Sequence, residues 1–97
     1  MAGIGVVATL TVAEGKTAEF EAIFTELAAQ VRANEPGNLF YTLTRSRANG
    51  QVYRVLEAYA DQAALDAHGK TDYFRAAGPK LGPCLAGAPE IEYLDSV

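Results

Sequence analysis

Residues 38–59 read NLFYTLTRSRANGQVYRVLEAY, and this stretch decides the fold. Its first part, about Asn38 to Ser46, alternates two sets of side chains: Leu39, Tyr41 and Leu43 against Phe40, Thr42 and Thr44. Alternation with a period of two is typical of a β-strand. Asn49-Gly50 tolerates the positive φ angles of a tight hairpin turn. We therefore expect a second strand over Gln51 to Tyr59, antiparallel to the first.

Upstream of this hairpin the sequence predicts a strand and then a helix. Residues 3–12 are β-branched or apolar at both odd and even positions, which predicts a strand buried on both faces. From Lys16 to Ala33 the apolar spacing changes to three and four, as on one face of a helix. Pro36 ends this helix, because proline offers no amide hydrogen and disfavours helical backbone before it.

Downstream the pattern predicts further helical segments and a closing strand. Asp61 is a candidate N-cap for a short helix through His68, with Gly69 as a left-handed terminator. A helical turn follows at about residues 71–77. Two Gly-Pro pairs then interrupt the pattern, so residues 79–85 are expected to form a separate short helical piece. Residues 89–97 close the chain as a fourth strand.

The resulting order, β-α-β-β-α-β, predicts a single α+β domain over residues 1–97 with the ferredoxin-like plan. Two helices would cover one face of a four-stranded antiparallel sheet. The strands are apolar on both faces, so the uncovered face would be a large exposed apolar patch. A second copy of the sheet packed against it about a two-fold axis would bury that patch, and we therefore expect a homodimer.

Composition excludes several classes of function. The chain has 97 residues, 49% of them hydrophobic, and a net charge of −4, which gives no basic surface for a nucleic-acid backbone. From Met1 onward no positively charged region precedes the first apolar residues, as a signal peptide would require, and no apolar run could span a membrane. Cys84 is the only cysteine, so no intrachain disulfide can form. We expect a cytoplasmic protein.

An ordered set of short motifs resembles the antibiotic biosynthesis monooxygenase superfamily of dimeric α/β barrels. The resemblance covers nearly the whole chain and includes small quinol monooxygenases and an isomerase that processes the phosphorylated autoinducer-2 signal. The motifs in this sequence are Glu14-Gly15-Lys16, Glu35-Pro36-Gly37, Glu57-Ala58-Tyr59, His68 followed by Thr71-Asp72-Tyr73-Phe74, and Pro89-Glu90-Ile91.

The resemblance implies a pocket between sheet and helices in each subunit. Enzymes of this superfamily often oxidise phenols or quinols with dioxygen and no bound metal or flavin. An electron-rich phenolate can itself reduce oxygen, so such a protein needs a base, an orienting hydrogen bond and a dry pocket. The haem-degrading members carry a first-strand Asn and a Trp. This chain has Ala8 near that position and no Trp, which disfavours haem.

His68 and Glu57 are the candidate catalytic residues. His68 is the only histidine, and imidazole titrates near neutral pH, which suits proton transfer. A purely structural histidine, bonded to a backbone carbonyl or capping a helix, is the alternative. Glu57 shares its strand face with Tyr53, Val55 and Tyr59, so burial there would raise its pKa. The alternative for Glu57 is a cross-strand pair, with a neighbour of Arg54 or with Arg45, that holds the sheet edge.

Several aromatic residues and one amide are candidates for contact with the substrate. Aromatic rings at such positions also build cores and dimer interfaces, and surface exposure is a simpler explanation for the amide. The candidates are Tyr41, Tyr59, Tyr73, Phe74, Phe40 and Asn38.

Three functions remain open at this stage. The first is a cofactor-independent monooxygenase acting on a small quinol or phenol. The second is an isomerase of a small phosphorylated, sugar-like ketone, which would need Lys or Arg inside the pocket. The third is a non-catalytic dimeric ligand-binding or stress-response protein, with His68 buried against backbone and no open pocket. The one His and the one Cys lie too far apart in sequence to suggest a metal site.

Overall fold

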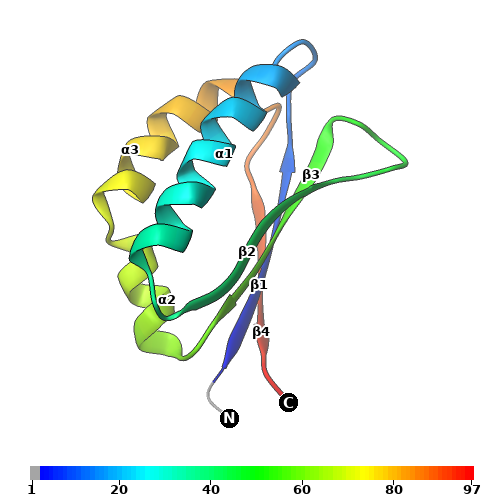
Figure 1. Ribbon diagram of the computed structural model, residues 1–97. Coiled ribbons are helices and arrows are strands. Elements are labelled where there is room, and N and C mark those ends of the chain that lie inside the picture. Colours follow the sequence, from blue (N-terminus) through cyan, green and yellow to red (C-terminus); the bar gives the residue numbers. More distant parts are fainter. Residues whose placement is uncertain (1–2) are drawn as a thin grey trace.

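The computed structural model describes residues 3–97 as one four-stranded antiparallel sheet with helices packed on one side (Figure 1). Met1 and Ala2 lie outside the described residues. The prediction about a signal peptide, which starts from Met1, therefore falls partly outside them. The strands are β1 (Ile4–Thr11), β2 (Asn38–Arg45), β3 (Val52–Tyr59) and β4 (Glu90–Asp95), in the spatial order β2-β3-β1-β4. The helices are α1 (Thr17–Asn34), α2 (Gln62–Gly69) and α3 (Asp72–Leu81), followed by the 3₁₀ turn η1 (Gly82–Cys84). The predicted α+β ferredoxin-like fold is confirmed, with its second helix divided into α2 and α3.

The central strand β1 separates the two faces of the sheet. Its side chains at Val6, Ala8 and Leu10 are buried beneath the helices, whereas Val7 and Thr9 between them are only half-buried. Strand β1 pairs with β3 on one side and with β4 on the other. The expectation that this strand is buried on both faces therefore holds for one face of the single chain.

Helix α1 builds the core against the inner face of the sheet, which we define as the face turned toward the helices. Its apolar stripe is almost fully buried at Phe20, Phe24 and Val31. The ring of Phe24 stacks on Tyr41 of β2 with centroids 5.8 Å apart. Tyr41, and with it every second residue of β2, is thereby fixed on the inner face.

The end of α2 differs from the prediction. Gly69 does not adopt a left-handed conformation, because Gly15 is the only residue with positive φ among residues 3–97. The C-cap is Lys70, with φ −99°. The carbonyl of His68 instead accepts a hydrogen bond of 2.9 Å from the Thr71 hydroxyl, which supplies a partner at the helix end without a left-handed turn.

The predicted break at Gly78-Pro79 is also wrong. Helix α3 continues through Pro79 to Leu81, and the separate piece is shorter, covering only η1. Proline removes the hydrogen bond to the carbonyl four residues earlier, which here belongs to Arg75. Arg75 and Pro79 are both exposed on α3, so water can form a hydrogen bond with the Arg75 carbonyl.

The outer face of the sheet, turned away from the helices, carries exposed apolar side chains. Phe40 on β2, Leu56 on β3 and Leu94 on β4 are 50%, 37% and 43% exposed. Val7 lies opposite Leu56 in the register of β1 and β3, so it joins the same face. Among residues 3–97, no helix has both the length and the apolarity needed to cross a membrane.

Candidate active site

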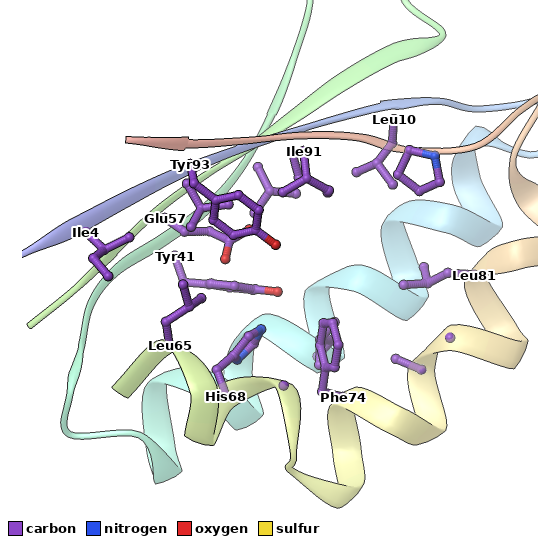
Figure 2. Close-up of a pocket in the computed structure, with 18 of the residues that line it drawn as sticks. Ile4, Leu10, Tyr41, Glu57, Leu65, His68, Phe74, Leu81, Ile91 and Tyr93 are labelled. Carbon is purple, nitrogen blue, oxygen red and sulfur yellow. The ribbon is translucent and has the colours of Figure 1, made fainter. Parts of the chain in front are cut away.

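A cavity of about 990 Å³ lies between the inner face of the sheet and helices α2 and α3 (Figure 2). One wall consists of inner-face residues of β1 and β4, such as Val6 and Ile91. The other wall includes His68 of α2 and Phe74 of α3. Tyr93 of β4 is 65% exposed, so the cavity is open to solvent along that strand.

Glu57 of β3 is a carboxylate in a mostly apolar wall of this cavity. Its Oε1 accepts a 2.7 Å hydrogen bond from the Tyr59 hydroxyl. Burial raises the pKa of Glu57, and the Glu35 charge adds to this effect, while the hydrogen bond from Tyr59 and the proximity of His68 oppose it. The alternative ion pair with Arg45 is not formed, because Arg45 instead contacts Glu21 at 3.5 Å.

His68 is held in the wall by a second carboxylate. Its side chain is 5% exposed, and Nδ1 lies 3.0 Å and 3.1 Å from the two carboxylate oxygens of Glu35. An ionised carboxylate can only accept, so Nδ1 carries the proton and donates it. Asp61 fixes the start of α2 by accepting from the amide of Ala64 at 2.8 Å, which places His68 in its last turn.

The second ring nitrogen of His68 faces the cavity. Nε2 makes no hydrogen bond within residues 3–97, yet no buried polar side-chain atom among those residues lacks a partner. Nε2 is therefore accessible, and His68 is a lining residue of the cavity. Figure 2 shows its ring rising from α2 toward Tyr41. With Nδ1 protonated, Nε2 has the lone pair that a general base needs.

Glu35 is the functional residue that the sequence reasoning missed. It lies in the turn between α1 and β2, and its side chain is only 9% exposed. Its Oε2 also accepts a hydrogen bond from the Tyr73 hydroxyl. A Cβ on the nearby Gly37 would lie 2.6 Å from the Cβ of Ala64, so glycine is what lets this turn approach α2. The Glu35-Pro36-Gly37 motif was visible, but we interpreted it only as a turn.

Three tyrosines surround the two carboxylates and remain neutral hydrogen-bond donors at pH 7. Burial, together with the neighbouring carboxylates, raises the pKa values of Tyr41 and Tyr59, and the pKa of Tyr73 rises to about 12. The rings of Tyr41 and Tyr59 lie 5.3 Å and 5.5 Å from that of His68, by centroid distance. They confine the imidazole from the side of the sheet.

The structure separates the predicted site residues into three groups. Those that line the cavity are His68, Glu57, Tyr41 and Phe74. Tyr59 and Tyr73 lie behind the lining and donate to its carboxylates. Phe40 is on the outer face, on the opposite side of the sheet, and Asn38 donates to the Phe40 carbonyl at 3.2 Å instead of entering the cavity.

Within residues 3–97 no group of three or more His, Cys, Asp or Glu side chains is arranged to hold a metal ion.

The sequence matches the family profile described as antibiotic biosynthesis monooxygenase over residues 3–80. It is 61% identical to a Caulobacter crescentus protein provisionally named an antibiotic biosynthesis monooxygenase, with 99% of this chain and 91% of that chain covered and a TM-score of 0.97. A conserved protein from Methanosarcina mazei is 29% identical, with 100% and 95% covered and a TM-score of 0.93. SnoaB, a cofactor-independent oxygenase from Streptomyces nogalater solved as its N63A mutant, is 24% identical, with 99% and 94% covered and a TM-score of 0.86. No curated protein matches this chain.

The raised pKa of Glu57 predicts a pH-dependent effect of Glu57→Gln on stability. A carboxyl group whose pKa is raised by folding stabilises the fold below its unfolded pKa of about 4.3, and this contribution is lost as the pH rises through the folded pKa. Gln does not titrate, so the stability of the variant relative to wild type should increase from pH 4 to pH 7. The increase should be about 1.4 kcal/mol per unit by which the pKa is raised.

Urea unfolding of both proteins across this pH range measures the difference. Glu26→Gln is the matched control, because it removes the same charge from an exposed position on α1 and should give a nearly constant difference. A constant difference for Glu57→Gln as well would show that folding leaves the Glu57 carboxyl unperturbed.

Proposed function

Because the chain belongs to the antibiotic biosynthesis monooxygenase family, we propose that it is a cofactor-independent monooxygenase that oxidises a small quinol or phenol with dioxygen. The observation that carries this proposal is the buried Glu35–His68 pair, which holds a proton-accepting Nε2 at an apolar, aromatic cavity beside Glu57. Independence from cofactors is part of the proposal. It is supported by the resemblance in sequence and by the named property of the S. nogalater protein, whose 24% identity shows a shared fold alone.

The side chains of the cavity suit the proton transfers of such a reaction. Nε2 of His68 accepts the proton of a substrate hydroxyl, and Glu35 stabilises the resulting imidazolium. The quinolate passes one electron to dioxygen, and the two radicals combine to form a carbon–oxygen bond. The imidazolium then returns its proton to the peroxide.

The final step releases water. The ring carbon loses its hydrogen as a proton while the oxygen–oxygen bond breaks, and the expelled hydroxide takes up a proton. The sum is one quinol and one dioxygen giving one hydroxyquinone and one water. Glu57, with its raised pKa, lies where it can exchange a proton with the oxygen intermediates.

Neither alternative function is favoured by the cavity. An isomerase of a phosphorylated ketone needs cationic side chains for the phosphate, but within residues 3–97 no Lys or Arg lines the cavity. A non-catalytic role was expected to leave His68 bonded to backbone and the pocket closed. His68 is bonded instead to the Glu35 carboxylate, in the wall of a cavity that opens beside Tyr93.

We further propose that the protein acts as a homodimer in the cytoplasm. The apolar outer face, with Phe40, Leu56 and Leu94 exposed, matches the self-complementary surface of a two-fold dimer. The single cysteine, Cys84, is a buried free thiol, which is compatible with a reducing compartment.

His68→Ala should abolish dioxygen consumption. Removing the base leaves the quinol hydroxyl protonated, and loss of a general base slows turnover by about 10²- to 10⁴-fold. An oxygen electrode with a panel of dihydroquinones and phenols, in the presence of a chelator, measures the rate. Arg75→Ala, at an exposed position on α3, is the control and should keep the wild-type rate.

Two outcomes of this assay would count against the proposal in different ways. Uptake by the wild type at the spontaneous rate for every compound would reject the oxygenase. Equal uptake by wild type and His68→Ala would keep the oxygenase and reject the role of His68.

Glu35→Gln should lower kcat by about 10- to 100-fold while KM changes little. Glu35 reaches the substrate only through His68, so its loss removes orientation and charge from the base rather than a contact with the substrate. Glu35→Asp keeps the charge and should recover part of kcat. A fall in substrate affinity without a fall in kcat would assign Glu35 a merely structural role.

Leu56→Asp should convert the dimer into a folded monomer, because it places a charge on the outer face. Light scattering coupled to gel filtration measures the mass, and circular dichroism measures the fold. Val55→Asp, one residue earlier on the buried inner face, should instead unfold the chain. A Leu56→Asp protein that stays dimeric would exclude the outer face as the interface.

A further inference from the structure

The charged residue types that line the cavity are all acidic. Glu57, Asp66 and Asp95 contribute carboxylates, and no Lys or Arg among residues 3–97 is part of the lining. The last residue of α2, Gly69, also lines the cavity. The carboxyl end of a helix carries a partial negative charge. Full and partial charges of the walls therefore act in the same direction, against an anion and in favour of a cation.

The acidic groups are arranged along the cavity in a definite order. Tyr93 pairs with Val6, and Val6 pairs on its other side with Glu57. Asp95 is one two-residue step further along β4, opposite Ile4. Because β1 lies between β3 and β4, Asp95 is displaced from Glu57 by about 7 Å along the strands and by about 10 Å across them.

The two ends of the cavity consequently differ in character. Figure 2 shows Ile4 and Leu65 at one end and Leu10 and Leu81 at the other, with Glu57 and His68 between them. Asp66 follows Leu65 on α2 and Asp95 lies opposite Ile4, so both carboxylates belong to the first end. The cavity therefore runs from an acidic end, past the proposed reaction centre, to an apolar end.

Aromatic rings add to the preference for a cation. Tyr41, Phe74 and Tyr93 contribute rings to the cavity walls. The face of an aromatic ring attracts an ammonium group and gives no comparable attraction to a carboxylate. An aromatic body can pack against these rings while its charged substituent lies beyond them.

From this arrangement we infer that the preferred ligand is a hydroxylated aromatic compound that carries a protonated amine on the side of its ring system opposite the reacting hydroxyl. This inference rests on the proposed function, since it places the hydroxyl at Glu57 and His68. The ammonium group lies between Asp66 and Asp95, and the apolar part of the ligand extends toward Leu10. Anionic aromatics, including hydroxybenzoate-like acids, are rejected.

Three naphthols that differ only in one substituent test this directly. They are 6-(aminomethyl)-2-naphthol, which is cationic, 6-(hydroxymethyl)-2-naphthol, which is neutral, and 6-hydroxy-2-naphthoate, which is anionic. Their fluorescence gives dissociation constants under anaerobic conditions, where no turnover occurs. The cation should bind about tenfold more tightly than the anion at low salt, with the neutral compound between them, and the ratio should fall as salt screens the exposed carboxylates.

A pair of variants assigns the preference to the acidic end. Asp66→Asn with Asp95→Asn should bring the three dissociation constants to within about threefold of one another. Glu14→Gln with Glu26→Gln is the matched control, because it removes the same net charge from exposed positions outside the sheet that do not line the cavity. The control should keep the tenfold ratio.

Each result separates this inference from the proposed function. Equal binding of the cation and the anion by wild type, or a ratio that survives in the Asp66/Asp95 variant, would overturn the selectivity while leaving the oxygenase intact. If the ratio of the two dissociation constants were lost equally in the double Glu→Gln control, the preference would come from the net charge of the protein. That result would overturn the assignment of the preference to Asp66 and Asp95. If none of the three naphthols binds, the inferred ligand is overturned, and the dioxygen-uptake assay with dihydroquinones and phenols decides the proposed function separately.

Discussion

The buried contact between Glu35 and His68 is the constraint on which the cavity depends. It joins the turn after α1 to the last turn of α2, and the Tyr73 hydroxyl adds α3 to the same carboxylate. A buried carboxylate is tolerable only when its oxygens are hydrogen-bonded, and leaving a buried polar group without its partner costs about 1–3 kcal/mol, or more for a charged group. Here every carboxylate oxygen of Glu35 has a donor. Three segments are thus held to one carboxylate, and they form the helical wall of the site.

The alternation of side chains was sufficient to predict the strands and the sheet. The same alternation also limits which aromatic residues of β2 can line a cavity. Strict alternation places Phe40 and Tyr41 on opposite faces of β2, so only one of them could line a cavity. The sequence could not decide which face that is. The decision comes from α1, whose Phe24 stacks on Tyr41 and leaves Phe40 on the outer face. Contacts between elements that are distant in sequence, rather than periodicity, determine which of these residues line the cavity.

The same limit explains why Glu35 was overlooked and why the helix ends were misplaced. Glu35 lies 33 residues before His68, in a turn, where an acidic residue is ordinarily solvated. Its burial follows from the close approach of Gly37 to Ala64, which only tertiary structure reveals. At the end of α2, a hydrogen bond from the Thr71 side chain takes the place of the left-handed turn predicted at Gly69. In α3, solvent exposure allows the helix to continue through Pro79. A local signal remains reliable only where no alternative partner is near.

The acidic lining bears on which residue removes the substrate proton. A phenolate formed by loss of its proton to solvent would add a negative charge beside Glu57, in a cavity that already carries Asp66 and Asp95. Transfer of the same proton to Nε2 of His68 leaves the total charge of the cavity unchanged, since the imidazolium gained matches the phenolate formed. Glu35, behind the ring, stabilises that imidazolium at the moment it appears. In the proposed reaction His68, with Glu35 behind it, is therefore the base for the substrate hydroxyl, and Glu57 remains available to exchange protons with the oxygen intermediates.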